Sequence, residues 1–317
     1  MISPFSHGAS LLSVLLAACA MSTGNAVAQE VRSFAPLGDI LFSSDTDGFQ
    51  ALRTRAGAYV AYENPWRYTG FAAQSTRYNQ GDFSKNVQGL VGQYRDVRRD
   101  TLAGIEAEAG VVRVSGRLRP IGDATWRTIP VRGTAIDLMA SADLVETPKA
   151  LDRGIGYTFL SAGLEQQIGD RFTMTGLAGW QSFSDGNART HLRARLIWLA
   201  MPEDGVTLQL RFRQYATRSD DVGQAYFNPP EYRQLLGVAT IRKRTAGWIL
   251  SGAIGAGPEG TDVGRSHVSY LAEARAEGTI AGAVRLVLKA GYNRSAGYID
   301  SPKYAYRLFS ATFVVPY

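Results

Sequence analysis

The residues best suited to chemistry in this chain are basic side chains that recur at every second position. They lie in the segments 188–200, 204–217 and 282–294, and they are Arg193, Arg195, Arg211, Arg213, Arg285 and Lys289. Apolar residues such as Leu192, Ala194 and Leu196 occupy the intervening positions. Because the side chains of a β-strand point alternately to opposite faces, each strand has one basic face and one apolar face.

Four of these arginines belong to two neighbouring predicted strands. In-register pairing places like charges across from one another, which destabilises a sheet unless carboxylates or an anion intervene. Two interpretations stay open. The arginines either form a positive track for an acidic solute or polymer, or they form Arg–Glu and Arg–Asp pairs that brace the structure, with Glu273 and Glu277 as carboxylate donors.

Catalytic chemistry has little support in the sequence. His191 and His267 share the alternation of the charged residues around them, which indicates wall positions. Glu165 has no evident acidic partner for hydrolysis of a glycosidic bond. The sequence contains no glycine-rich phosphate loop, metal-ligand cluster or nucleophile elbow. We therefore expect no enzyme, no cofactor and no metal site.

The end of the chain indicates the fold class. Phe309, Ala311, Phe313, Val315 and Tyr317 are apolar or aromatic at every second position, and the chain stops on the aromatic. Outer-membrane β-barrels end in this way, with one set of side chains toward lipid and the other toward the lumen. Phe313, Val315 and Tyr317 are then the signal that the barrel-assembly machinery reads. A soluble sandwich with a terminal edge strand is the alternative.

The connections between the predicted strands alternate in length, as barrels with long extracellular loops and short periplasmic turns require. The long connections are 295–303, 256–264 and 218–229, and the short ones are 278–281, 244–247, 201–204 and 169–170. Arg or Lys on the lipid face at mid-depth costs about 2–4 kcal/mol, so the basic faces must point inward. Trp198 and Trp248 then fall near the periplasmic boundary and Trp180 near the extracellular one, where indole rings anchor a membrane interface.

The predicted fold is all-β, an antiparallel transmembrane β-barrel of about 16 strands. The first half holds strands near 49–61, 67–78, 84–96, 100–109, 111–120, 125–132, 133–145, 155–167 and 171–182. The stretch 100–132 is the least regular, and loss of one hairpin there gives fourteen strands, since the number should be even.

The amino-terminal segment predicts export. Residues 9–21 are apolar but too short to span a bilayer, and Ala26, Val27 and Ala28 form a signal-peptidase site. We expect a signal peptide at 1–28, a short periplasmic lead at 29–47 and a barrel at 48–317 in the outer membrane of a Gram-negative cell. The alternative is a lipoprotein whose Cys19 carries the lipid.

The overall charge bears on the partners. The formal net charge is +6, which favours acidic partners such as lipopolysaccharide phosphate or an anionic glycan. No nucleic-acid-binding motif is visible, and we expect no nucleic-acid partner. The expected partners are outer-membrane lipid, lipopolysaccharide and the barrel-assembly machinery.

One local motif ends the longest loop and enters a strand. It is Tyr226-Phe227-Asn228-Pro229-Pro230-Glu231-Tyr232, in which the prolines prevent strand pairing until after them. The aromatic rings could stack on sugars or pack the loop on the barrel rim. With the following alternating strand, the segment 45–48 and the segment 163–176, the motif resembles the barrel of the exopolysaccharide-secretion porins, a group that includes the export porins for cellulose and for poly-N-acetylglucosamine. The likeness covers residues 45–317.

The resemblance implies passage of a linear glycan across the outer membrane without catalysis. Members of that group carry a tetratricopeptide array before the barrel, so this chain resembles a short, stand-alone form that would need a separate periplasmic scaffold protein. The leading hypothesis is thus a channel for polysaccharide export. A general diffusion porin or a surface or phage receptor barrel is the second hypothesis, and a lipid-modifying barrel enzyme is the third.

Overall fold

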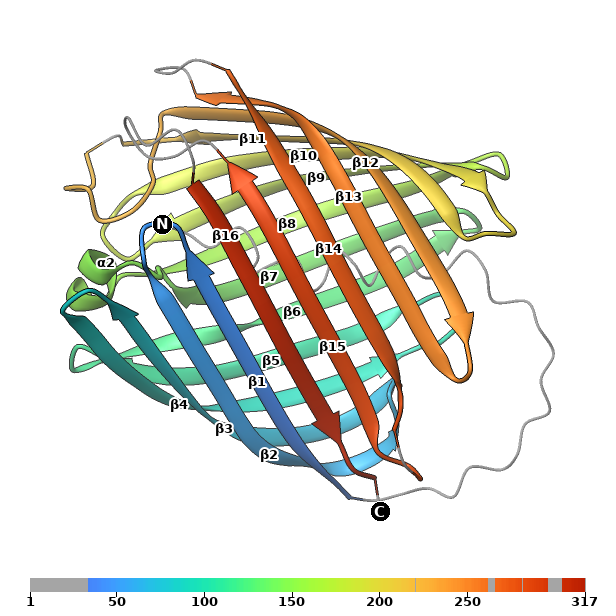
Figure 1. Cartoon of the computed structure of the whole chain (residues 1–317), viewed down its shortest axis with the longest axis horizontal. Coiled ribbons are helices and arrows are strands. Elements are labelled where there is room, and N and C mark those ends of the chain that lie inside the picture. The colour runs from blue at the N-terminus through green and yellow to red at the C-terminus, as the bar shows by residue number, and fades with distance from the viewer. Residues whose placement is uncertain (1–33, 220, 262–265, 281, 296–303, 317) are drawn as a thin grey trace.

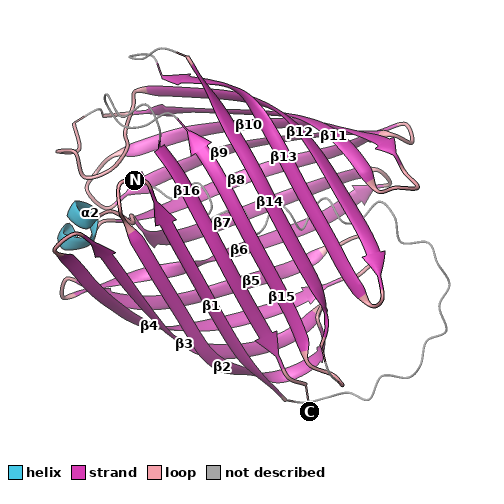
Figure 2. Ribbon diagram, viewed as in Figure 1, coloured by secondary structure: helices cyan, strands magenta, loops and turns pink. Residues whose placement is uncertain are grey.

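The computed structural model describes residues 34–219, 221–261, 266–280, 282–295 and 304–316. The predicted signal peptide, the alternative lipidation of Cys19 and the terminal residue Tyr317 lie outside the described residues. Nearly all of the described chain is β-strand (Figure 2).

The strands have the following bounds. They are β1 (Ala35–Asp45), β2 (Gln50–Asn64), β3 (Arg67–Gln80), β4 (Phe83–Val97), β5 (Gly104–Val114), β6 (Arg117–Val131), β7 (Thr134–Leu144), β8 (Gly156–Ile168), β9 (Phe172–Phe183), β10 (Ala188–Met201), β11 (Val206–Thr217), β12 (Glu231–Thr245), β13 (Trp248–Thr261), β14 (His267–Thr279), β15 (Arg285–Ser295) and β16 (Tyr304–Val314). A single short helix, α2 (Pro148–Arg153), lies between β7 and β8 in this part of the chain.

The strands form one closed barrel (Figure 1). Every strand pairs antiparallel with its neighbours in the chain, and β1 closes the sheet by pairing with β16 from Leu37 opposite Val314 to Asp45 opposite Tyr306. Closure leaves no sheet edge, which a membrane-spanning sheet requires because lipid offers no hydrogen bonds. The predicted antiparallel barrel of about 16 strands is confirmed.

Alternation of side chains explains why these segments form barrel strands. On β10, Leu192, Leu196 and Trp198 are 40–50% exposed and point outward, whereas Arg189 and His191 point inward and are buried. Such an inverted pattern, apolar outside and charged inside, is typical of barrels in lipid. Trp198 also stacks on Phe172, with ring centroids 6.3 Å apart at the end of both strands that adjoins the short turns, the end that the sequence analysis predicts to be periplasmic.

The prediction was wrong about residues 35–45, which form β1 rather than a periplasmic lead. Only Ile40 and Phe42 mark its outward face as large exposed apolar side chains, and the strand also contains residues with low β-propensity such as Gly38 and Asp39. Asp39 nevertheless has a place in the wall, because its Oδ2 accepts a hydrogen bond of 2.8 Å from Thr312 Oγ1 on β16.

The prediction also divided residues 100–132 wrongly. Three strands were expected, but the segment holds two, β5 and β6, joined by a tight turn. Ser115 and Gly116 have φ of 48° and 75° in that turn, the left-handed pair that a two-residue hairpin needs to match the strand twist. The missed β1 and the surplus strand compensate, so the strand number is correct although the early boundaries are not.

The helix α2 was not predicted. Its start is set by Thr147, whose side chain accepts a hydrogen bond from the Ala150 amide, and by Pro148 in the first turn. Gly154 ends it in the left-handed conformation at φ 62°. Within the described ranges, no helix is long and apolar enough to cross a membrane.

Candidate functional site: the lumen and its lid

The barrel encloses a cavity of about 870 Å³ lined mostly by strand residues. Asp170 and Glu203, in the short turns after β8 and β10, border it at one end, and Glu146, just after β7, borders it toward the other. Its wall includes Arg211, Glu273 and other charged side chains from many strands. The cavity therefore carries charged groups from many strands and reaches the short turns that the sequence analysis predicts to be periplasmic.

Four of the predicted basic residues come together on β10 and β11. Arg193 pairs directly across from Arg213, and Arg195 directly across from Arg211, as the sequence predicted. We call these four residues the arginine ladder. In the part of the chain that the structure describes, none of their guanidinium groups forms an ion pair with a carboxylate. The Nε atoms of Arg193 and Arg213 are buried without a hydrogen-bond acceptor.

Aromatic rings lie beside the rung of the ladder that Arg193 and Arg213 form. The Arg193 guanidinium lies 5.9 Å from the ring centroid of Phe159. The Arg213 guanidinium lies 5.9 Å from Tyr215 and 5.4 Å from Tyr232. A cation over an aromatic face gains electrostatic energy, so these rings hold the two guanidiniums without neutralising them.

The other two predicted basic residues lie apart from the ladder, on β15. Arg285 pairs with Glu277, which also accepts a 2.7 Å contact from Arg275. The bracing interpretation is therefore correct for Arg285 and Glu277. Lys289 and Glu273 both line the cavity, and neither has an ion-pair partner within 4.0 Å among the described residues.

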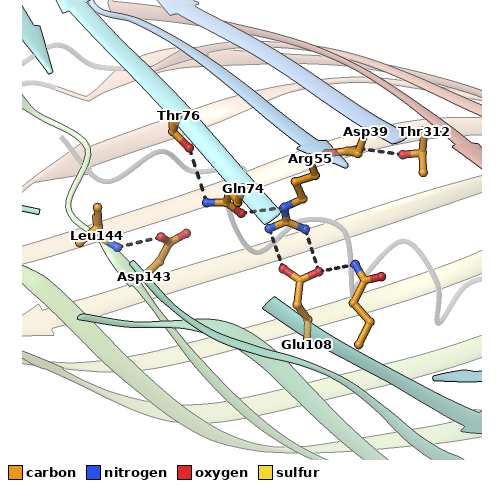
Figure 3. Close-up of polar contacts among 9 residues, drawn as sticks. Asp39, Arg55, Gln74, Thr76, Glu108, Asp143, Leu144 and Thr312 are labelled. Carbon is orange, nitrogen blue, oxygen red and sulfur yellow. Dashed lines mark hydrogen bonds and ion pairs between the residues drawn. The ribbon is translucent and has the colours of Figure 1, made fainter. Parts of the chain in front are cut away.

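Elsewhere on the inner wall, arginines form ion pairs with carboxylates that the sequence did not reveal. Arg127 Nη1 lies 3.0 Å from Asp137 and its Nη2 lies 2.6 Å from Glu165, so Glu165 is not isolated. Figure 3 shows a second brace, in which Arg55 contacts Glu108 at 2.6 Å and Gln74 at 2.7 Å. Asp137 and Gln74 are cross-strand neighbours of their arginines within one hairpin, whereas Glu165 and Glu108 lie on strands that are not adjacent to those of Arg127 and Arg55.

Two connections at the end where β7 and β11 finish contact each other, and we call them the lid. They are the segment 145–155, which contains α2, and the described residues of 218–230 (Figure 1). Thr147 Oγ1 donates to the Ala225 carbonyl, and Arg153 Nη1 donates to the Val222 carbonyl at 3.4 Å. Val145 and Ala150 share a buried apolar cluster with residues of the other connection. The lid is thus packed rather than open.

The aromatic motif fastens the lid to the barrel. Tyr226 stacks on Phe183 with centroids 4.8 Å apart, and its hydroxyl donates to Asp185 at 3.0 Å. Tyr232 stacks on Tyr215 at 4.9 Å and donates to Glu259 at 2.7 Å.

The remaining motif residues extend this attachment. Phe227 packs edge-on against Tyr232, Asn228 is buried, and the Pro229 carbonyl accepts a 2.8 Å hydrogen bond from Thr217 Oγ1. Tyr226 and Tyr232 are 2% and 4% exposed. In this structure their rings pack the loop, and sugar binding by them stays a prediction.

Arg189 is a functional candidate that the sequence reading missed. It lies on the same face of β10 as Arg193 and Arg195, and its guanidinium lies 4.8–5.7 Å from the rings of Phe183, Tyr215 and Tyr226. It also donates to the Asn228 side chain at 2.9 Å and to the Phe227 carbonyl. The alternation that identified Arg193 extends to Arg189 and could have revealed it.

The two histidines lie on the wall. His191 is buried, with Nε2 3.0 Å from Gln181 Oε1 and its ring edge-on to Phe159. His267 begins β14 opposite Glu259. The described residues contain no group of three or more side chains placed to hold a metal ion.

These features define the class of fold: a 16-stranded barrel of the outer-membrane type. No protein-family model matches the sequence, and no curated protein matches it. Among solved structures, the chain is similar to a bacterial polysaccharide outer membrane secretin, at 12% identity over 91% of this chain and 100% of that chain, with a TM-score of 0.65. It also matches the outer membrane protein OprD from Pseudomonas aeruginosa at 10% identity over 91% and 94% of the two chains, with a TM-score of 0.45. The likeness to the secretin concerns the fold.

Proposed function

We propose that this protein is an outer-membrane channel that exports an extracellular polysaccharide. The observation that carries the proposal is a lumen bordered by charged side chains that reaches the short turns at one end, while at the other end two connections pack on each other and Glu146 of one of them borders the cavity. A polymer made in the cell can enter such a lumen from the periplasmic side and displace the lid as it leaves. The fold likeness to a polysaccharide secretin, over the whole of that chain, supports this function.

The lid separates this proposal from a general diffusion porin. A pore for small solutes works with a permanently open mouth, whereas here two connections share a buried apolar cluster and hydrogen bonds. Separating them exposes that apolar surface, which costs about 25 cal/mol per Å². The cost favours a channel that opens only when its substrate is present.

The same proposal assigns roles to the two ends of the chain and to a partner protein. The signal peptide at 1–28 would deliver the chain to the periplasm, and Phe313, Val315 and Tyr317 would direct assembly by the barrel machinery. The outward position of Phe313 on β16 supports the assembly role. A separate periplasmic protein would supply the scaffold function. A lipid-modifying enzyme has less support, because such chemistry needs a histidine at the lipid boundary, and His191 is buried with its Nε2 3.0 Å from Gln181 Oε1.

Conductance in a planar bilayer tests the function. The refolded wild-type protein should pass little current, and the double variant Thr147→Ala and Tyr226→Ala, which loosens the lid at two attachments, should conduct steadily. Fragments of the host's own polysaccharide added on the periplasmic side should then block the current. A wild-type pore that conducts freely and ignores the fragments would instead support the diffusion-porin hypothesis. A folded lid variant that does not conduct would contradict both channel functions.

A further inference from the structure

We propose that the arginine ladder is a binding site for the acidic groups of the exported glycan, so that the polymer is anionic. The chemistry recognised is a planar or tetrahedral oxyanion, namely a carboxylate, sulfate or phosphate substituent. This inference rests on the proposed export function and adds the substrate class and the residues that select it.

The ladder carries an unfavourable charge arrangement. Two rungs of cross-strand arginines, Arg193 with Arg213 and Arg195 with Arg211, lie side by side on the inward faces of β10 and β11. Like charges directly opposite each other destabilise a sheet, and a charge withdrawn from water costs more unless it is paired. An anion bound between the guanidinium groups of the two strands removes both costs.

Several arginines elsewhere on the inner wall form ion pairs, in contrast to those of the ladder. Arg55 and Arg127 each lie 2.6 Å from a glutamate, and Arg275 lies 2.7 Å from Glu277. The ladder arginines have no such partner within ion-pair distance among the described residues, although the charge of Glu273 acts on both Arg195 and Arg211, and that of Glu165 on Arg195. Glu165 already forms an ion pair with Arg127. Several luminal arginines are therefore paired with carboxylates, whereas the four ladder arginines, like Arg53 and Arg189, form no ion pair among the described residues.

Part of the hydrogen-bonding capacity of the Arg193–Arg213 rung is also unused. The buried Nε atoms of Arg193 and Arg213 have no acceptor, whereas Arg211 Nε donates to Gln209 at 2.9 Å. A guanidinium presents a fork of donors that matches a carboxylate or phosphate oxygen pair. The free Nε donors of Arg193 and Arg213 therefore suit an oxyanion.

The position of the ladder suits a moving polymer. Arg211 lines the cavity, while Arg213 in the next rung contacts Tyr215 and Tyr232, the stacked pair that anchors the loop 218–230. Rungs two residues apart on a strand lie about 6.6 Å from each other, given a rise of about 3.3 Å per residue. An acidic chain can therefore bind the second rung before it leaves the first, and it reaches the lid attachment last.

Equilibrium binding tests the site without requiring transport. The refolded barrel in detergent is titrated calorimetrically with hexagalacturonate, with a neutral chitin hexamer, and with inorganic phosphate and sulfate. We expect hexagalacturonate to bind and the neutral hexamer to bind at least tenfold more weakly, and we expect affinity to fall as salt rises. Arg193→Gln with Arg213→Gln should weaken hexagalacturonate at least tenfold. Lys substitutions at both positions keep the charge without the guanidinium fork. Their affinity for hexagalacturonate should therefore lie between those of the wild type and the double Gln variant.

A matched control changes the same net charge outside the lumen. Arg77→Gln with Arg233→Gln removes two arginines that are exposed on β3 and β12, and it should leave binding unchanged. Equal weakening by both double variants, or tighter binding of the neutral hexamer, would overturn the anion site. Binding of free phosphate or sulfate as tightly as hexagalacturonate would also overturn it, by showing a small-anion site. The conductance test is independent, so a channel blocked only by neutral glycan would sink the anion site and keep the export function.

Discussion

Arg193 and Arg213 are direct cross-strand partners on β10 and β11, and each guanidinium rests on aromatic rings rather than on a carboxylate. Proteins retain such costly pairs where function requires them. The pair therefore links the stability of the barrel to the chemistry of its lumen.

The first prediction concerns this stability cost. Arg213→Glu places an opposite charge across from Arg193, and opposite-charge pairs contribute roughly 0.2–1 kcal/mol at such positions. The free energy of unfolding should rise by about that amount or more, as measured by urea denaturation in lipid vesicles with tryptophan fluorescence. The same variant should lose hexagalacturonate binding. A less stable variant would show that the two arginines do not repel each other in the folded barrel.

The second prediction concerns the Arg127 brace. Its side chain is 5% exposed and joins Asp137 to Glu165, so Arg127→Gln leaves two carboxylates without their partner. Loss of one member of a buried ion pair costs about 3–5 kcal/mol, and we expect urea unfolding to show a loss in that range. Arg67→Gln removes an exposed ion pair with Glu63 and Asp96 and should cost no more than about 1 kcal/mol. Equal losses in the two variants would contradict the bracing role.

The third prediction concerns the pH dependence of the lid. Burial and the charge of Asp143 raise the pKa of Glu146 to about 7 from an ordinary 4.5, against the opposing effects of Arg53 and the Tyr78 hydroxyl. Tyr78 Oη donates to Glu146 Oε1 at 3.2 Å. A carboxyl whose pKa is raised by folding favours the docked state while it is protonated. Docking of the segment 145–155 is therefore firmest below about pH 4.5 and weakens as the pH rises through 7, by roughly 1–3 kcal/mol.

Anisotropy of a dye attached at Lys149→Cys, an exposed position in α2, reports this docking. The dye should be more mobile at pH 8 than at pH 5, and Glu146→Gln should remove most of the difference. If the Gln variant keeps the full pH response, another group controls the lid.

The fourth prediction concerns Arg189. Its guanidinium contacts three aromatic rings and two lid acceptors, so Arg189→Met keeps much of the bulk and loses the hydrogen bonds. Amide exchange in the described residues of 218–230 should become at least tenfold faster, because local opening becomes easier. Exchange in β2 and β3, which Arg189 does not contact, should stay unchanged. An unaltered lid would mean that the aromatic stack alone holds the loop.

The alternation of apolar and polar residues made most of the fold predictable. Segments such as 204–217 alternate cleanly, so strand type, inward face and the pairing of Arg195 with Arg211 could all be predicted. β1 was missed because Gly38 and Asp39 have low β-propensity and the outward face carries few large apolar side chains. Its place in the wall depends on pairing with β16 at the far end of the chain.

The lid could not be predicted, because its contacts join distant parts of the chain. Thr147 and Ala225 are 78 positions apart, and neither residue type identifies the other. Glu165 likewise lacked a partner in the sequence until the closed sheet placed Arg127 beside it. Local pattern predicts which way a side chain points, whereas the pairing of polar groups across the lumen depends on the closed barrel.

Release of polymer from proteoliposomes is the most direct test of export through this barrel. Vesicles holding the barrel with the loosened lid, Thr147→Ala and Tyr226→Ala, are loaded with fluorescent oligogalacturonate and with a neutral dextran of equal length bearing a second dye. We expect release of the acidic oligomer well ahead of the dextran, and loss of that preference when Arg193→Gln and Arg213→Gln are added. Retention of both polymers by correctly folded barrels would contradict the export channel.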